Sequence, residues 1–379
     1  MFSLYIHIPY CSAICPYCDF NVYAVDPRPE TRYVDALLGE MSHAAAEAPW
    51  RGDSVQTIYL GGGTPSLFEP ESIRRILGGV YDRWAVEPAV EVTLEATPES
   101  VTAERFAAYR DAGVNRVSVG LQSMHATHLA RLGRLHGPED NHRAFAAART
   151  AGLDNISLDL IFAVPGQTLA EWEADLRTVA ALSPEHVSAY NLTYEERTPF
   201  FRWRARGTIQ PAGEDDEEAM FALARDILPA AGLEAYEISS FARSGYRSRH
   251  NGNYWNGTSY LGIGAGAHSY VGEGWGRRWW NERDHRGYMA TVERRGLARA
   301  ETEELTREQA MTEFVFLGLR RAEGIDTTVF AARFGEGFEA RFATVPDLCA
   351  EGLLEATAAG YHLSRKGLLL ADSLFALFV

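Results

Sequence analysis

Three of the four cysteines in this chain are grouped at Cys11, Cys15 and Cys18, whereas Cys349 stands alone near the other end. Thiolates bind soft metals well. A structural zinc ion would need a fourth ligand, such as His7 or Cys349, because zinc sites are tetrahedral. A [4Fe–4S] cluster on three cysteines instead leaves one iron open to a substrate or cofactor. The Cys-x3-Cys-x2-Cys spacing therefore predicts a metal centre, and both kinds stay open on the cysteines alone.

Further polar and glycine residues follow strand-like runs. The sequence GGGTP occupies 61–65, Glu95 and Gln122 end the next two runs, and Asp159 lies inside the fifth. In folds built from βα units, chemistry gathers at the carboxyl ends of the parallel strands. These residues are therefore candidates for a site. The alternative is structural: Glu95 and Asp159 as buried partners of Arg or Lys, and Gln122 as a strand cap.

The elements that must position these residues alternate between strand and helix over the first 200 residues. Short apolar, often β-branched runs predict parallel strands buried on both faces. They lie at 3–8, 57–60, 90–94, 116–120, 156–162 and 186–192. Helices are predicted between them, at 31–45, 70–84, 103–112, 138–151 and 169–182. We therefore expect an α/β fold, a partial (β/α)6 barrel.

The pattern changes after the barrel. Residues 213–231 predict one acidic amphipathic helix, and 236–268 are rich in Gly, Asn, Tyr and Ser. Helices at 307–320 and 327–334, followed by two short strand-like runs, predict a smaller, mostly helical, winged-helix-like C-terminal unit. We expect three parts: a barrel at 1–210, a barrel extension at 211–300 and a C-terminal helical domain at 301–379.

The amino-acid composition argues against several classes of protein. The 379 residues carry 36 Lys and Arg against 51 Asp and Glu, a net charge of −15. This balance argues against nucleic acid as a partner, because phosphate binding needs clustered basic residues. No apolar run approaches the roughly 20 residues of a membrane helix. The N-terminus shows no basic leader, and a secreted disulfide scaffold would use more cysteines, so we expect a cytoplasmic protein.

The opening YIHIPYCSAICPYCDFN resembles the radical S-adenosylmethionine (radical SAM) superfamily. In that superfamily the open iron of a [4Fe–4S] cluster binds the amino and carboxylate groups of SAM. An electron from the cluster then cleaves SAM to methionine and a 5′-deoxyadenosyl radical. The GGGTP loop resembles the superfamily's glycine-rich strand end, where absent side chains let the backbone approach SAM. The resemblance favours the iron–sulfur interpretation over zinc.

Within the superfamily, the chain resembles the oxygen-independent coproporphyrinogen III oxidase-like family. The resemblance runs through most of the chain, including GGGTPS, TLEATPES, VSVGLQS, LDLIFAVPGQT and YEISSFA. Two groups compete within this family. The oxidase has a fourth cysteine where this chain has Phe20, and it carries an N-terminal extension that is missing here. The stretch SRHNGNYW at 248–255 resembles the heme-associated motif of the HemW-type heme chaperones.

The resemblance therefore implies a HemW-type heme chaperone. It would bind a [4Fe–4S] cluster, SAM and heme, and deliver heme to acceptor proteins, membrane-associated ones included. This interpretation assigns no catalytic residue and leaves cleavage of SAM open. The alternative is the oxidase itself, which converts two propionates to vinyls through a substrate radical. A zinc-stabilised binding module is a third interpretation.

Site residues carry over by position. The resemblance implies SAM contacts at Tyr5, Tyr17, Gly62, Gly63, Thr64 and Glu95. Three further residues match positions that hold a second SAM in the oxidase: Gln122, Arg134 and Asp159. Phe20 is a position at which this chain departs from the oxidase pattern. Arg134 suits a carboxylate because its guanidinium can form a bidentate pair.

His250 is the predicted axial ligand of heme, because neutral imidazole commonly binds heme iron. Arg243, Arg247 and Arg249 flank it and would pair with propionates. The alternative is that His250 hydrogen-bonds a loop that closes the barrel mouth. His268 is a second candidate ligand with the same structural alternative.

Overall fold

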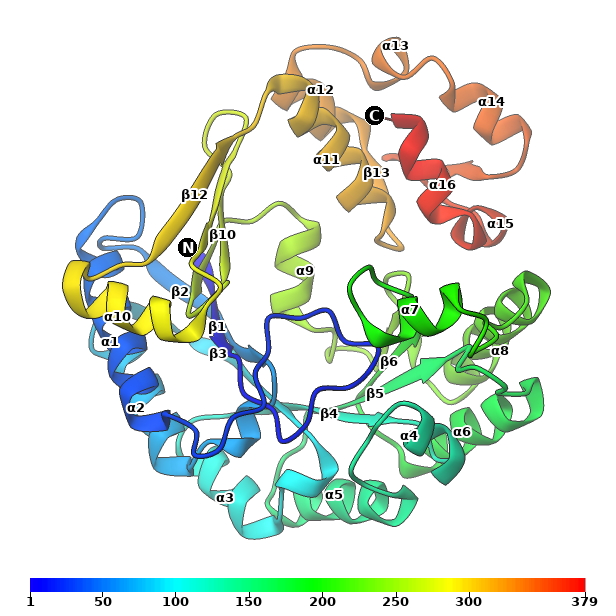
Figure 1. Ribbon diagram of the computed structural model, residues 1–379. Coiled ribbons are helices and arrows are strands. Elements are labelled where there is room, and N and C mark those ends of the chain that lie inside the picture. Colours follow the sequence, from blue (N-terminus) through cyan, green and yellow to red (C-terminus); the bar gives the residue numbers. More distant parts are fainter. Residues whose placement is uncertain (379) are drawn as a thin grey trace.

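The computed structural model describes residues 1–378 (Figure 1). A 12-stranded sheet curves through the larger part of the chain, in the order β12-β11-β10-β9-β1-β2-β3-β4-β5-β6-β8-β7. Its first six strands are β1 (Phe2–Ile8), β2 (Ser54–Gly62), β3 (Ala85–Ala96), β4 (Arg116–Gln122), β5 (Ile156–Phe162) and β6 (His186–Asn191). The others are β7 (Glu234–Ala235), β8 (Ser240–Ala242), β9 (Tyr260–Ile263), β10 (His268–Val271), β11 (Arg277–Asn281) and β12 (Arg299–Glu304).

The centre of the sheet confirms the expected partial barrel of parallel strands. Strands β1 to β6 pair in parallel and in sequence order. Strand β1 is buried at six of its seven positions, as expected for a parallel strand covered on both faces. Parallel pairing brings the carboxyl ends of all these strands to one edge, where ligands bind in such folds.

Most helices of the larger part cover the outer face of the curved sheet, whereas α9 lies inside its curve (Figure 1). The helices of this part are α1 (Glu30–Ala46), α2 (Pro70–Tyr81), α3 (Ala103–Asp111), α4 (Ala126–Arg131), α5 (Pro138–Thr150), α6 (Leu169–Leu182), α7 (Pro199–Ala205), α8 (Glu214–Ala230), α9 (Arg249–Trp255) and α10 (His285–Arg295), with 3-10 turns at Pro65–Leu67 and Pro98–Ser100. The predicted helices match α1, α2, α3, α5, α6 and α8 within a few residues. One hydrophobic core spans this part, from Phe2 to Ala298.

Short strands extend the sheet at both edges. Strand β9 pairs in parallel with β1, so residues 3–6 lie beside residues 260–263. Strands β10, β11 and β12 continue the sheet in antiparallel order, and β8 and β7 do so beyond β6. The glycine-rich stretch at 236–268 therefore contains β8, α9 and β9. A Cβ at Gly262 would collide with the carbonyl of His268, which explains a glycine there.

The C-terminal unit has a core of its own, formed by residues between Ala310 and Phe378. Its helices are α11 (Arg307–Leu319), α12 (Thr327–Phe334), α13 (Phe338–Arg341), α14 (Val345–Ala350), α15 (Arg365–Leu369) and α16 (Ala371–Phe375), with a 3-10 turn at Ala376–Phe378. Strands β13 (Ile325–Asp326), β15 (Gly360–Leu363) and β14 (Leu354–Ala356) form a small antiparallel sheet. The expected smaller, mostly helical unit is confirmed, while the exact domain boundaries stay a prediction.

Within residues 1–378, none of the helices has both the length and the apolar character that a membrane crossing requires.

Candidate functional site

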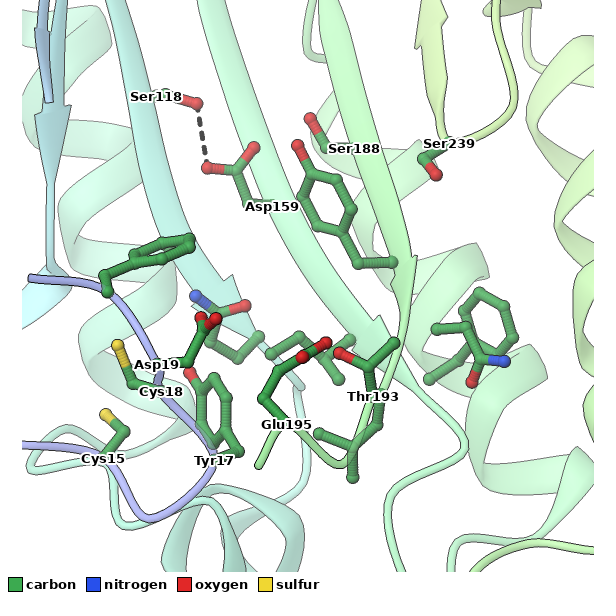
Figure 2. A pocket seen from close by; sticks show the side chains of 18 of the residues that line it. Cys15, Tyr17, Cys18, Asp19, Ser118, Asp159, Ser188, Thr193, Glu195 and Ser239 are labelled. Carbon is green, nitrogen blue, oxygen red and sulfur yellow. Dashed lines mark hydrogen bonds between the residues drawn. The ribbon is translucent and has the colours of Figure 1, made fainter. Parts of the chain in front are cut away.

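The three clustered cysteines lie on the loop between β1 and α1, which crosses the carboxyl edge of the barrel (Figure 1). Backbone hydrogen bonds fold the loop back on itself, from Cys11 N–H to the Tyr23 carbonyl (3.0 Å) and from Tyr23 N–H to the Pro9 carbonyl (2.7 Å). Cys11, Cys15 and Cys18 all line a cavity of about 1270 Å³ inside the barrel. Figure 2 shows Cys15, Tyr17 and Cys18 on this loop, with Asp159 on the strands deeper in the cavity.

Hydrogen-bond donors from elsewhere in the chain reach two of the sulfur atoms. Nη1 of Arg134 lies 3.5 Å from Cys15 Sγ, and the Thr64 hydroxyl lies 3.7 Å from Cys11 Sγ. Burial raises the pKa of Cys11 and of Cys18 to about 11. Donors and a cation beside the sulfurs favour the thiolate form that a metal requires.

The donor set fits an iron–sulfur cluster with one open iron. All four cysteines are unpaired thiols, and Cys349 packs in the C-terminal core, far in sequence from the other three. Among the described residues, no three His, Cys, Asp or Glu side chains converge on a point that one metal ion could occupy. A cluster of four irons is wider than one ion, so it accepts thiolates that are spaced further apart.

The glycine-rich end of β2 packs directly under the cysteine loop. Gly62 has a φ of +114°, and a Cβ there would lie 2.5 Å from the His7 ring. A Cβ at Gly63 would lie 2.7 Å from the backbone oxygen of Tyr10. Both positions require glycine, because the backbone is left-handed at the first and the loop lies too close at the second. Both residues, with Thr64, line the cavity.

Two partly buried carboxylates face the cavity. Glu95 accepts hydrogen bonds from the Tyr59 hydroxyl (2.8 Å) and the Gly62 N–H (3.0 Å), and burial raises its pKa to about 7. Asp159 accepts hydrogen bonds from Ser118 (2.8 Å, dashed in Figure 2) and Ser157 (3.1 Å), and burial raises its pKa. In the part of the chain that the structure describes, neither carboxylate forms an ion pair. The positive charge of Arg116 nevertheless acts to lower the pKa of both carboxylates, which favours the interpretation of the two as neighbours of a buried arginine.

Gln122 and Arg134 also line the cavity. Gln122 ends β4 with a φ of +64°, an uncommon conformation for a residue with a side chain, and such outliers gather at functional sites. Arg134 donates through Nη2 to the Gly120 carbonyl (3.4 Å) in addition to its contact with Cys15. The segment after α4 is thereby held against the cysteine loop.

The two tyrosines expected to contact SAM differ in their position. Tyr17 lines the cavity, and its ring lies 6.2 Å from that of Phe200 on α7. Tyr5 is not among the residues that line the cavity. Its hydroxyl lies 2.9 Å from Nδ1 of His7, whose ring supports Gly62. Tyr5 therefore contacts the glycine loop only through His7.

The predicted heme ligand His250 is completely buried between α9 and β2. Its Nδ1 lies 2.9 Å from the Thr57 hydroxyl and its Nε2 lies 2.9 Å from the Tyr254 hydroxyl. The ring stacks on Tyr59 at 5.0 Å, and burial lowers its pKa to about 3. An axial ligand needs an accessible nitrogen lone pair, and this packing offers none. The geometry supports the structural interpretation of His250, which ties α9 to β2 rather than closing the mouth.

The other residues expected around heme also lie outside the cavity lining. His268 is exposed and stacks on Trp280 at 5.5 Å. Arg243 donates to the Pro184 carbonyl, Arg249 to the Ala89 carbonyl, and Arg247 pairs with Glu323.

Sequence reasoning missed several cavity residues. Arg116 and Ser188 line its inner part, and residues 368–373 of the C-terminal unit line one wall. A signal for Arg116 was present, because Arg116, Ser118, Gly120 and Gln122 alternate with Val117, Val119 and Leu121 along β4. A polar residue at every second position marks one face of a strand. No comparable sequence pattern predicts that residues 368–373 of the C-terminal unit line the cavity.

Comparisons with known proteins agree with this geometry. Residues 5–179 match the family model of the radical SAM superfamily, and residues 305–370 match that of the HemN C-terminal domain. The chain is 35% identical to the heme chaperone HemW of Bacillus subtilis (strain 168), over 100% of this chain and 99% of that protein. It is 38% identical to the heme chaperone HemW of Escherichia coli (strain K12), over 100% and 98%.

A solved structure shares the fold. Coproporphyrinogen III oxidase (HemN) from Escherichia coli, a radical SAM enzyme, superposes with a TM-score of 0.85 at 23% identity, over 100% of this chain and 89% of that one. This likeness confirms the α/β architecture and the helical C-terminal unit.

Proposed function

This chain belongs to the heme chaperone HemW family within the radical SAM superfamily, and we propose that it binds heme and delivers it to acceptor proteins. The observation that carries the proposal is identity of 35% and 38% to heme chaperones over essentially the full length of both chains. The oxidase shares the fold at 23% identity. A shared fold supports many activities, whereas similarity along the whole chain supports a shared one.

We propose that Cys11, Cys15 and Cys18 hold a [4Fe–4S] cluster. Support comes from three thiols on one loop at the cavity, with donors from Arg134 and Thr64 on two of the sulfurs. When bound, such a cluster supplies one-electron chemistry and an open iron for a ligand. The chain's own contribution is to orient the thiols and to place the Thr64 and Arg134 donors beside two of the sulfurs, which offsets part of the effect of burial.

We propose that SAM lies in the cavity beside this loop. Tyr17, Thr64, Glu95, Gln122, Arg134 and Asp159 present aromatic, hydroxyl, amide, carboxylate and guanidinium groups to that space. The carboxylates suit an amino group or ribose hydroxyls, because a carboxylate accepts hydrogen bonds only. Gly62 and Gly63 allow close approach of a ligand to the backbone. Tyr5 is a positioning residue in this proposal, because it acts on Gly62 through His7.

The mouth of the same cavity suits heme. Ile14, Phe20 and Leu135 line it and are 52%, 66% and 61% exposed. Exposed apolar side chains around a concave site mark a binding surface for a flat apolar ligand. Phe20 occupies the position where the oxidase pattern has a cysteine, so the change supplies apolar surface at the mouth.

Two measurements on one anaerobic preparation of cluster-reconstituted protein distinguish the chaperone interpretation from the oxidase interpretation. We expect heme titration, followed by the Soret band, to saturate at one heme per chain. We expect no protoporphyrinogen from coproporphyrinogen III, SAM and reductant, although the same preparation cleaves SAM. Product formation would identify an oxidase instead. Absence of saturable heme binding would rule out the chaperone.

We propose that the protein works in the cytoplasm, because three clustered unpaired thiols persist only under reducing conditions.

A further inference from the structure

Helix α9 joins the barrel to the C-terminal unit. It contacts β2 on one side and α11 on the other (Figure 1). Its first turn is fixed to the barrel, because the His250 ring bonds to the Thr57 hydroxyl at 2.9 Å. The backbone N–H groups of Arg249 and His250 also donate to the Glu91 carboxylate, at 3.0 and 2.9 Å. The start of α9 therefore belongs to the barrel.

The end of α9 packs against the C-terminal unit. The guanidinium of Arg320, directly after α11, lies 4.4 Å from the centre of the Trp255 ring. Such a cation–π contact is stronger where water is excluded, and the Arg320 side chain is only 22% exposed. The next residue, Arg321, donates to the side-chain oxygen of Asn256. Two consecutive residues at the end of α9 thus contact two consecutive residues at the end of α11.

The Trp255 ring is the main described support of the Arg320 side chain. The other partner, Oε2 of Glu237, lies 3.7 Å from Nη2 of Arg320, which is beyond hydrogen-bonding distance. Nε of Arg320 and Nε1 of Trp255 are buried without a hydrogen-bond partner among residues 1–378. The position of Arg320 therefore depends on the aromatic face beneath it.

Other contacts between the two parts are exposed or lie elsewhere. The ion pairs Arg247–Glu323 and Arg365–Asp226 join them at the surface, where all four side chains are more than half exposed, so each pair contributes little. At the β10–β11 hairpin, the ring of Trp275 stacks on Phe334 at 5.9 Å. Loss of the contact at α9 should therefore displace the near side of the C-terminal unit without detaching the unit.

That near side forms part of the cavity. Arg320 and residues 368–373 line it. Leu319, next to Arg320, shares one hydrophobic core with Ala371, so the end of α11 and the wall at 368–373 belong to one packed unit. A shift of Arg320 away from Trp255 would therefore move the wall as well.

We propose that Trp255 is a positioning residue, which through Arg320 holds the C-terminal unit where residues 368–373 close one side of the cavity. Heme affinity then depends on Trp255, although Trp255 itself does not line the cavity. The inference rests on the proposed function, because heme is the ligand that reports it. The stretch at 248–255 thereby joins two parts of the molecule: its first turn is fixed to the barrel and its last residue to the C-terminal unit.

The test uses Trp255→Ala and Arg320→Ala, alone and combined, in full-length, cluster-reconstituted protein. We expect Trp255→Ala to weaken heme binding about tenfold in an absorbance titration, at an unchanged Soret wavelength, because no ligand of the iron is altered. The double variant should bind heme as Arg320→Ala does, since Trp255 acts through Arg320. Trp255→Phe keeps an aromatic face and should retain most of the affinity.

Hydrogen exchange reports the position of the wall without a ligand. We expect Trp255→Ala to speed amide exchange in residues 368–373 and at the end of α11, and to leave exchange in β1 to β6 unchanged. The affinity for SAM should also match that of the wild type, because the residues proposed to contact SAM lie on the cysteine loop and the barrel strands.

Arg299→Ala is the matched control. The guanidinium of Arg299 lies 4.5 Å from the ring centre of Trp279, so it makes the same kind of contact as Arg320. Both residues lie on the neighbouring strands β11 and β12, outside the cavity lining. We expect this variant to bind heme like the wild type. If Trp255→Ala does not fold, the comparison of Arg320→Ala with Arg299→Ala decides the question.

Heme affinity in Trp255→Ala within about twofold of the wild type would overturn the positioning role. So would a loss in Arg299→Ala as large as that in Arg320→Ala, or a full effect of Trp255→Ala in the Arg320→Ala background. A wild type that binds no heme would overturn the proposed function instead. Hydrogen exchange would then still decide whether Trp255 holds the wall in place.

Discussion

Nη1 of Arg134 lies 3.5 Å from Sγ of Cys15, although 119 residues separate the two in sequence. A positive charge beside an iron-bound sulfur stabilises the reduced, more negative state of a cluster. We therefore expect Arg134→Met to make the reduction potential of the reconstituted cluster more negative at unchanged iron content. Redox titration followed by electron paramagnetic resonance measures this shift. Arg131→Met is the control, because Arg131 bonds to the Pro165 carbonyl instead. An unchanged potential would show that Arg134 does not act on the cluster.

Replacement of a cluster cysteine should remove the metal centre. We expect Cys15→Ser to lower iron and acid-labile sulfide to a small fraction of the wild-type content, because a hydroxyl is a poor ligand for a soft metal. Cys349→Ser should retain the full content, since Cys349 packs in the C-terminal core. Iron retention by Cys15→Ser, or loss by Cys349→Ser, would contradict the assignment of the ligands.

A side chain at Gly62 should disturb the loop that supports the cysteines. Alanine there must adopt a φ of +114° and displace the His7 ring. Strained backbone of this kind costs about 1–3 kcal/mol, so we expect a lower free energy of unfolding and weaker SAM binding. Gly78→Ala is the control, because nothing lies within 4 Å of a Cβ in the middle of α2. That change should stabilise the protein by about 0.5–1 kcal/mol.

Phe20 should contribute to heme binding without contributing to stability. Its ring is 66% exposed at the mouth of the cavity. We expect Phe20→Ala to change the free energy of unfolding by less than about 0.5 kcal/mol and to weaken heme binding about tenfold. Val329→Ala serves as the control, because Val329 is 50% exposed and lies away from the cavity lining. Equal heme affinity in the two variants would place heme elsewhere.

His250 should act on stability rather than on heme. Replacing it by alanine removes two buried hydrogen bonds and leaves the hydroxyls of Thr57 and Tyr254 without a partner. We expect His250→Ala to lower the free energy of unfolding at pH 8 by about 2–4 kcal/mol, measured by urea denaturation. Where the variant is folded, its heme titration should match that of the wild type. Loss of the Soret band of a nitrogen-ligated heme would instead restore His250 as the axial ligand.

The difference between wild type and His250→Ala should shrink as pH falls. The pKa of His250 is lowered from 6.5 to about 3 by burial, so only the unfolded chain takes up the proton between these values. The contribution of His250 is therefore fully present above pH 6.5 and is lost as pH falls toward 3, by at most about 1.4 kcal/mol per pH unit. A difference that is constant from pH 8 to pH 5 would contradict a buried neutral imidazole.

The sequence predicted the elements that form by local signals. Strands β1 to β6 each contain a short stretch rich in apolar and β-branched residues, and α1, α2, α3, α5, α6 and α8 have helical periodicity, so their positions follow from local pattern. The edge strands β7 to β12 contain only two to six residues each, and β9 is defined by pairing with a strand far away in sequence. Such pairing depends on tertiary contacts, so the local sequence of a short segment does not predict it.

The candidate site shows the same difference between features set by local sequence and features set by long-range contacts. The cysteine motif and the glycine loop could be placed from sequence, because their chemistry demands particular residue types at short spacing. The orientation of His250 could not, since its burial depends on Thr57, 193 residues earlier in the chain. The same holds for Tyr5, which a motif assigns to a ligand and which packs against His7 instead.

The pairing of β1 with β9 has a consequence for biosynthesis. Strand β1 is made first, yet one of its two neighbours, residues 260–263, leaves the ribosome more than 250 residues later. At 5–20 residues per second, translation of that interval takes roughly 10–50 s. During this time one edge of β1 has no partner, and the cysteine loop that follows it lacks its final support. The nascent chain therefore carries an unpaired strand edge beside three thiols, a stage at which it is exposed to aggregation through the strand edge and to oxidation at the thiols.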